Sequence, residues 1–361
     1  MLISKAEMES LRVISVYKDA PAEILNTERY MLNTLLDLGY LKLNRAKTSL
    51  RLTKAGAEVL LSAGIPAEIE TRSAGYMRML ERRMQSTQVA LFFNSMDINV
   101  FSEDIPREIL ELRYLPTSVL RGNNYSNVLG MSKFIGLLYT VEFTYAVYNI
   151  SNPTETFYPQ TDEDIFTREI ISANTPVKIL YVSGRNLDEM AEGIVKQSPT
   201  EKRICGFEQA IERFNSPVCL VSMNDTGCNQ LRIMLTEDYK EKLARDMLEE
   251  DYCYVNADFL DASFNGKYLI VFIDFDVKRL ETALKIVNNL HILVLKEQLP
   301  ALRVLLNNRK AVIYAIEAEK SFEVLGIPKP QDRSTEQYKT KEGGGVVVKT
   351  IPKTNKRKSQ V

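Results

Sequence analysis

Residues 27–61 constrain the fold of this chain more than any other segment. Apolar residues recur there at helical spacing, alternate with polar residues in two short runs, and then return to helical spacing. Gly39 stands directly after the first helical run, in the position that commonly ends a helix. The predicted order is therefore helix, strand, basic turn, strand and helix, which is typical of a winged helix-turn-helix domain.

The preceding residues complete this predicted domain. Ser4 and Glu7 have the spacing of a capping box, which predicts a helix over residues 5–17. A short second helix is expected over residues 22–25. We therefore predict a winged helix-turn-helix domain that spans residues 1–66.

The third helix and the hairpin after it carry the predicted nucleic-acid contacts. Thr27 is the expected N-cap of that helix, and the strands of the hairpin are expected over residues 40–43 and 50–52. Side chains that can reach phosphates or base edges lie on the polar face of the helix and at or beside the hairpin tip. The candidate DNA-binding residues are Arg29, Tyr30, Asn33, Arg45, Lys47 and Arg51.

The charges around these candidates leave two interpretations open. Glu28 and Asp37 weaken the positive field of the third helix, so DNA binding would need a homodimer or contacts made elsewhere on the chain. In the other interpretation, the basic side chains form a solvated surface on a winged helix that binds protein or is purely structural.

Composition places the chain among ordinary globular proteins. It has 361 residues, enough for two or three domains, with 45% hydrophobic residues and a net charge of −1. No apolar run approaches a membrane span, and the first residues are too charged for a signal peptide, so we expect a cytoplasmic protein with no membrane partner. Four cysteines without a C-x-x-C pair and a single histidine argue against zinc, and no metal or cofactor is predicted.

Beyond the first domain, the pattern predicts a connector helix and then a body. The connector spans residues 67–88 and carries Arg72, Arg78, Arg82 and Arg83 on polar positions. We interpret these arginines as a solvated basic face, and an extension of the DNA-facing surface is the alternative.

The body is predicted over residues 89–327 as a mixed α/β fold, Rossmann-like or degenerate nuclease-like. Short apolar runs that predict strands occupy residues 89–93, 134–139, 145–150, 177–182, 218–221 and 268–273. Helical patterns occupy residues 187–196, 206–214, 237–249 and 277–289. The part over 89–150 is poor in helix and is expected to contain antiparallel strands. One interpretation divides the body into two subdomains near residues 151–176. The sequence shows no internal repeat.

Three local patterns invite a chemical interpretation. Asp274 and Asp276 end an apolar strand and could hold a divalent cation, or could cap the following helix. Residues 221–227 could line a crevice at a strand end, or form an Asx-rich turn. His291 beside an apolar run could act as a base, although a hydrogen-bonded structural histidine is the plainer interpretation.

Missing motifs exclude several enzyme classes. The sequence contains no phosphate-binding loop, no G-x-G-x-x-G after a strand and no G-x-S-x-G elbow. The paired histidines of rolling-circle relaxases cannot be built from one histidine. We therefore predict a DNA-binding protein and not an enzyme of these classes.

The last 34 residues, 328–361, differ in composition from the rest. They contain nine basic and three acidic residues, a net charge of +6 that leaves −7 on residues 1–327. Such a segment is expected to be disordered, and to serve as a basic arm for phosphate contacts or as a solubilising tail.

The pattern over residues 38–61, a helix followed by LGYL, a basic turn and LRLTKAGAEVLL, resembles the winged-helix start of replication-relaxation-type proteins of Gram-positive plasmids and integrative elements. Residues 131–150 are similar to a two-strand segment of related mobile-element proteins. The resemblance implies DNA binding during plasmid or element processing, with a relaxase or replication protein as partner. Some members carry a nuclease-like second domain, but no catalytic residue of such a domain matches a position here.

Together these observations predict a DNA-binding accessory or regulatory protein of a mobile genetic element, acting in replication, relaxation or transfer. It would bind double-stranded DNA through the winged helix. The alternatives are a metal-dependent nuclease that uses Asp274 and Asp276, and a protein-interaction scaffold.

Overall fold

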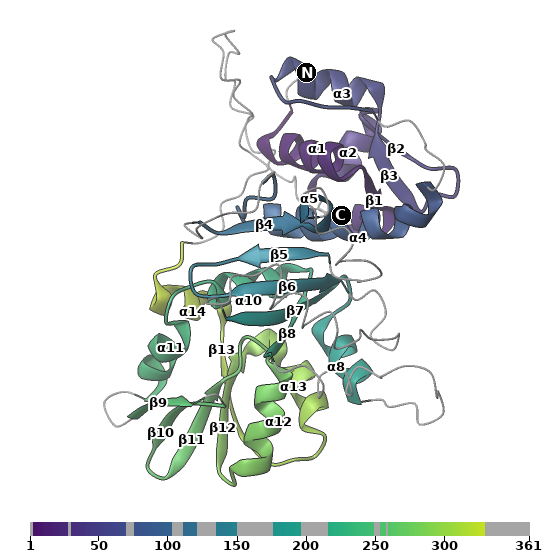
Figure 1. The fold of residues 1–361 in the computed structure, drawn as a ribbon. Helices are drawn as coiled ribbons and strands as arrows, with labels where there is room; N and C mark the ends of the chain where they lie inside the picture. Colours follow the sequence, from purple (N-terminus) through teal and green to yellow (C-terminus); the bar gives the residue numbers. More distant parts are fainter. Residues whose placement is uncertain are drawn as a thin grey trace, which may run out of the picture.

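The computed structural model describes residues 3–27, 30–69, 76–102, 111–120, 135–149, 176–195, 216–248, 253–257 and 259–328. These residues form a mixed α/β protein with three β-sheets (Figure 1). The smallest sheet belongs to an N-terminal unit, and the remainder of the chain builds two five-stranded sheets. The predicted fold class is confirmed at this level.

The N-terminal unit has a three-stranded antiparallel sheet with β3 between β1 and β2. Its elements are α1 (Lys5–Tyr17), β1 (Asp19–Pro21), the 3₁₀ helix η1 (Ala22–Asn26), α2 (Leu32–Asp37), β2 (Leu41–Leu43), β3 (Ser49–Leu52) and α3 (Lys54–Ser62). The capping box of Ser4 and Glu7 is present, as predicted. The predicted hairpin is confirmed as β2 and β3.

The start of α2 differs from the prediction. Thr27 does not cap this helix, because its amide bonds to the Ile24 carbonyl and ends η1. The helix begins at Leu32, after Met31 turns the chain in a left-handed conformation with φ of 52°. Threonine is a common N-cap, but here the left-handed backbone of Met31 sets the start of the helix.

The start of α3 packs closely against the turn between α2 and β2. Thr53 caps α3 and also donates to the Gly39 carbonyl over 2.7 Å. A Cβ atom at Gly56 would lie 2.4 Å from the Tyr40 carbonyl oxygen, so this position requires glycine. This close approach holds the residues before β2 against the start of α3, so both ends of the hairpin are anchored.

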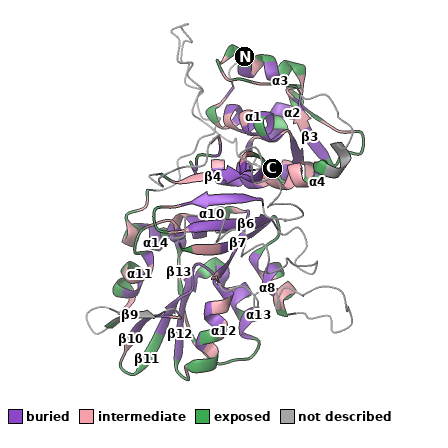
Figure 2. Ribbon diagram, in the orientation of Figure 1, coloured by how far each residue is buried: buried purple, intermediate pink, exposed green. Residues whose placement is uncertain are grey.

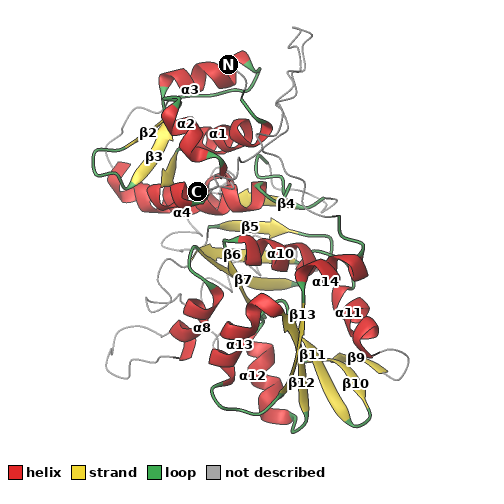
Figure 3. Ribbon diagram, turned by 180° about the vertical axis from the view of Figure 1, so that it is seen from behind, coloured by secondary structure: helices red, strands yellow, loops and turns green. Residues whose placement is uncertain are grey.

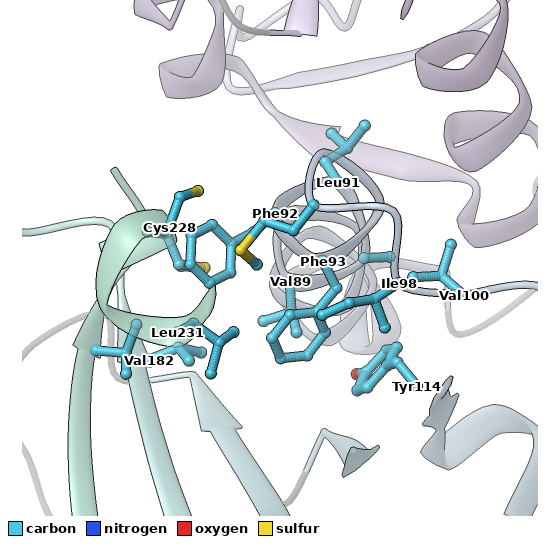
Figure 4. Close-up of a cluster of buried hydrophobic side chains, with 14 of the residues drawn as sticks. Val89, Leu91, Phe92, Phe93, Ile98, Val100, Tyr114, Val182, Cys228 and Leu231 are labelled. Atoms are coloured by element: carbon cyan, nitrogen blue, oxygen red, sulfur yellow. The ribbon is translucent and has the colours of Figure 1, made fainter. Parts of the chain in front are cut away.

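Helix α4 (Tyr76–Asn94) joins the N-terminal unit to the body. A connector helix over 67–88 was expected, with a strand over 89–93, but these apolar residues continue the helix and the strand prediction is wrong. A short, fully apolar run fits either structure, and here it is buried on all sides. Figure 4 shows Phe92 beside Cys228 and Leu231, while Phe93 lies 5.0 Å from the Tyr114 ring, centroid to centroid.

The first five-stranded sheet has the strand order β4-β5-β6-β7-β8. Strands β4 to β6 are antiparallel, as expected for this part of the chain, and β6, β7 and β8 are parallel. The elements are β4 (Arg113–Pro116), α5 (Thr117–Leu120), β5 (Gly136–Tyr139), β6 (Thr144–Asn149), β7 (Val177–Ser183), α8 (Leu187–Val195), β8 (Val218–Ser222) and α10 (Asp225–Met234).

The second five-stranded sheet follows α11 and repeats the same plan. Its order is β9-β10-β11-β12-β13, antiparallel from β9 to β11 and parallel from β11 to β13. The elements are α11 (Tyr239–Leu248), β9 (Cys253–Ala257), β10 (Leu260–Phe264), β11 (Lys267–Val271), α12 (Val277–Ile286), β12 (Leu290–Leu295), η5 (Lys296–Gln298), α13 (Leu299–Leu306), β13 (Val312–Ile316) and α14 (Ala318–Leu325). Figure 3 shows helices on both faces of the sheets.

This topology corrects two predictions about the body. A Rossmann-like sheet is parallel and reverses its strand order, whereas these sheets run in sequential order and begin with antiparallel strands. The split near residues 151–176 is also wrong, because β6 and β7 on either side of that segment pair within one sheet. The change from the first large sheet to the second occurs between β8 and β9.

Most predicted segments of the body are confirmed. The expected strands appear as β5, β6, β7, β8 and β11, and three expected helices as α8, α11 and α12. The helix predicted over 206–214 and all of the tail after Pro328 lie outside the described residues. Figure 2 shows that the strands of the first large sheet are mostly buried, as is β12 of the second sheet. No helix in the described ranges is both long and apolar enough to cross a membrane.

A buried hydrogen bond between units gives a first prediction. The Tyr17 hydroxyl of α1 donates to the Val100 carbonyl over 2.7 Å. Tyr17→Phe leaves this carbonyl without its donor, so we expect the free energy of unfolding to fall by about 1–2 kcal/mol in urea titrations. Tyr268→Phe, at a side chain with 39% exposure, is the control and should change it by less than about 0.5 kcal/mol.

Candidate functional site

The tip of the β2–β3 hairpin is held in one shape by Asn44. Its side-chain oxygen accepts from the Thr48 and Ser49 amides, and its side-chain amide donates to the Thr48 hydroxyl over 2.9 Å. The Lys47 amide also bonds to the Asn44 carbonyl. The tip is therefore ordered before any ligand binds.

Two predicted DNA-binding residues project from this tip. Arg45 and Lys47 are both exposed, and Lys47 has a left-handed backbone with φ of 55°. Lys42 on β2 is exposed as well and was missed among the candidates. Its signal was present in the sequence, because Lys42 stands between two apolar residues in an alternating strand.

Arg51 is more embedded than the tip residues. It lies on the central strand β3, directly opposite Lys42 on one side and Asp19 on the other. Directly opposite residues of neighbouring strands project from the same face, so Arg51 and Lys42 share a face of the hairpin. Arg51 is half-buried. Its neighbour on β1 is the acidic residue Asp19.

Helix α2 contributes a short polar surface next to the hairpin. Asn33 and Thr34 are exposed, and the Asn33 side chain donates to the Leu25 carbonyl of η1 over 2.9 Å. Asn33 thus ties α2 to η1 while remaining at the surface. Asp37 is also exposed and lowers the positive potential there, as expected.

One candidate is excluded from this surface by burial. Tyr30 has only 4% exposure and packs in the core of the N-terminal unit, so its prediction as a DNA contact is wrong. The late start of α2 is the reason, since Tyr30 precedes the helix and does not lie on its polar face. Arg29 and Glu28 lie outside the described residues.

Arg82 and Arg83 of α4 make contacts within the molecule, whereas a solvated basic face was predicted for them. Arg83 lies 3.7 Å from the Asp19 carboxylate of β1, with 18% of its side chain exposed. Arg82 donates to the Thr117 hydroxyl of the body over 3.2 Å. These two side chains join α4 to both parts of the molecule, whereas the side chains of Arg72 and Arg78 are not among those described.

A second candidate site is the charged cluster at the end of β11, defined here as Lys240, Asp261, Asp274, Asp276 and Arg279. Asp274 lies 2.6 Å from the Lys240 ammonium and 3.7 Å from the Arg279 guanidinium. Arg279 also pairs with Asp261. The three carboxylates and Arg279 are all buried.

Electrostatics separate the two aspartates of the D-x-D pattern. Burial alone would raise the pKa of Asp274, but Lys240 and Arg279 outweigh it and lower that pKa to about 2. Burial and the adjacent Asp274 carboxylate raise the pKa of Asp276 above its usual value. Asp274 is therefore a firmly charged partner of two cations.

Asp276 has a capping role, which was one of its two predicted roles. Its side chain accepts from the Arg279 amide at the start of α12 and from the Val218 amide at the start of β8. Both aspartates thus have protein partners. Within the described ranges, no group of three or more His, Cys, Asp or Glu side chains is placed to hold a metal.

The two remaining local patterns take their plainer interpretations. Asn224 caps α10 by accepting from the Gly227 amide over 3.0 Å, which is the expected Asx turn. His291 Nδ1 lies 3.0 Å from the Tyr314 hydroxyl and its ring stacks on the Tyr314 ring. Each side chain has a structural partner.

Comparisons with known proteins add no family to this description. No family model, no curated protein and no solved structure matches the chain.

The charged cluster gives a second prediction. Asp274→Asn leaves Lys240 without its carboxylate partner and leaves Arg279 paired with Asp261 alone, and we expect it to lower the free energy of unfolding by roughly 3 kcal/mol at pH 7. The native carboxylate has a depressed pKa of about 2, so its contribution is complete above about pH 4 and is lost as the pH falls toward 2. The difference between native and variant chains should therefore shrink over that interval in urea titrations.

The matched control is Glu241→Gln on α11, the helix that also carries Lys240. Glu241 pairs with Arg245 at the surface, over 2.6 Å, and its loss should cost less than about 1 kcal/mol at any pH. A difference for Asp274→Asn that stays constant down to about pH 2 would contradict the pairing described above.

Proposed function

We propose that this chain is a DNA-binding accessory or regulatory protein of a mobile genetic element, and that its N-terminal unit is a winged helix that binds double-stranded DNA. The order helix, strand, helix, helix and hairpin, with the third helix next to an antiparallel sheet, supports this assignment. In such domains one helix enters the major groove and the hairpin contacts the backbone.

The observation that carries the proposal is the preorganised basic tip of the hairpin. Asn44 fixes its backbone, and Arg45 and Lys47 extend from it into solvent. Basic side chains on a rigid hairpin can contact phosphates without first losing backbone freedom. Exposed Lys42 on the adjoining strand extends the same positive surface.

Helix α2 would supply the contacts to base edges. Thr34 is exposed on it, and Asn33 sits at the surface beside the turn from η1. The negative charge of Asp37 makes this helix a poor source of affinity, so the hairpin would provide most of the phosphate contacts.

The mobile-element setting rests on the resemblance of residues 38–61 to replication-relaxation-type proteins. A relaxase or replication protein is the corresponding partner. The α/β body would then serve assembly or regulation and not base recognition.

Gel shifts with labelled duplex DNA test this proposal. Arg45→Ala combined with Lys47→Ala removes two phosphate contacts, so we expect weaker binding and a slope of log affinity against log salt that is smaller by about 2. Lys310→Ala combined with Lys320→Ala is the control, because it removes the same charge from exposed positions far along the chain. This control should bind as the native chain does.

A nicking assay with the Asp274→Asn variant and the gel shifts with the native chain separate the two alternative functions. A metal-dependent nuclease would nick supercoiled plasmid in magnesium and lose that activity in Asp274→Asn. A protein-interaction scaffold would shift no duplex even at low salt, which would refute DNA binding.

A further inference from the structure

The body consists of two α/β units built on one plan. The first unit runs from α4 to α10 and the second from α11 to α14. Each begins with a helix, continues with three antiparallel strands, and then adds two parallel strands, each followed by a helix; the short α5 between β4 and β5 has no counterpart between β9 and β10. The helix α12 connects the third and fourth strands of the second unit, and the corresponding connection of the first unit lies outside the described residues.

Equivalent elements of the two units pack against each other. Helix α8 follows the fourth strand of the first unit and contacts α13, which follows the fourth strand of the second. Helix α10 follows the fifth strand of the first unit and contacts α14, which follows the fifth strand of the second (Figures 1 and 3). An interface in which a surface meets its own counterpart is the kind found in twofold homodimers.

This internal interface is apolar and well covered. Leu187 and Met190 of α8 belong to one buried cluster with Leu302 and Leu305 of α13. Asp276 adds a polar link, because it caps α12 of the second unit and accepts from the Val218 amide of the first. The surfaces that a pair of separate units would use for dimerisation are therefore buried inside one chain.

One N-terminal unit is attached to this pair in the part of the chain that the structure describes, and its position is fixed. Tyr17 bonds to the Val100 carbonyl, and Asp19 pairs with Arg83 of the first unit's leading helix. The leading helix of the second unit, α11, instead exposes Lys242, Arg245 and Asp246. That charged surface suits solvent and not a second copy of the apolar contact made by α4.

We propose that the duplicated body takes the place of a homodimer, so that one chain binds one asymmetric duplex site. This inference rests on the proposed function. Dimeric helix-turn-helix proteins read two inverted half-sites about one helical turn apart, because the symmetry of the DNA mirrors that of the protein. A chain whose twofold partner is internal, and whose described residues contain one DNA-binding unit, would read one sequence with no inverted copy.

Selection from a random-sequence duplex library with the full chain tests the inference. The enriched duplex would then be mixed with the protein, and the mass of the complex measured by sedimentation. We expect an enriched motif without an inverted repeat, and a complex of one 41.2 kDa chain per duplex. Arg45→Ala combined with Lys47→Ala is the control and should enrich no motif.

The outcomes distinguish this inference from the function on which it rests. Two chains per duplex, or an inverted repeat with half-sites about 10 base pairs apart, would overturn the inference and leave DNA binding intact. A native chain that enriches no motif and shifts no duplex would refute both.

Discussion

Burial of the C-terminal half of α4 is the constraint on which the arrangement of the molecule depends. Val89 to Phe93 have at most 1% exposure, and they pack at once against the N-terminal unit, α10 and the segment before β4. Full burial of such side chains contributes roughly 1.5–3 kcal/mol each, so this one helical segment outweighs the polar contacts around it. Arg82 and Arg83 then define the orientation, since each reaches a different neighbour.

Alternating apolar and polar residues predicted the hairpin, and short apolar runs predicted buried strands such as β5, β6 and β8, but one such run proved to be helical. The hairpin was recognisable because Lys42 and Arg51 alternate with apolar neighbours. Residues 89–93 were misassigned because five consecutive apolar residues satisfy a buried strand and a buried helix equally. Tyr30 was predicted at the surface because the expected N-cap, Thr27, precedes the observed N-cap, Met31, by four residues and instead ends η1.

The duplication of the body left no trace in the sequence for a physical reason. In both units the leading helix holds the end of the third strand, but the first uses the amides of Gln88 and Asn149, while the second uses the ion pair of Lys240 and Asp274. The topology of each unit is specified by backbone pairing and by burial of apolar side chains, and many different side chains meet these two requirements. A repeat of topology is therefore visible only once the strands are paired.

The attachment of α4 has a mechanical consequence. The Tyr17–Val100 and Asp19–Arg83 contacts couple the small sheet to α4 and to the segment that follows it. If the hairpin binds a duplex as proposed, a force on it would be transmitted along α4 to Gln88 and to Asn149 at the end of β6, the central strand of the first large sheet. Deformation of the bound duplex and deformation of the body would then be mechanically coupled.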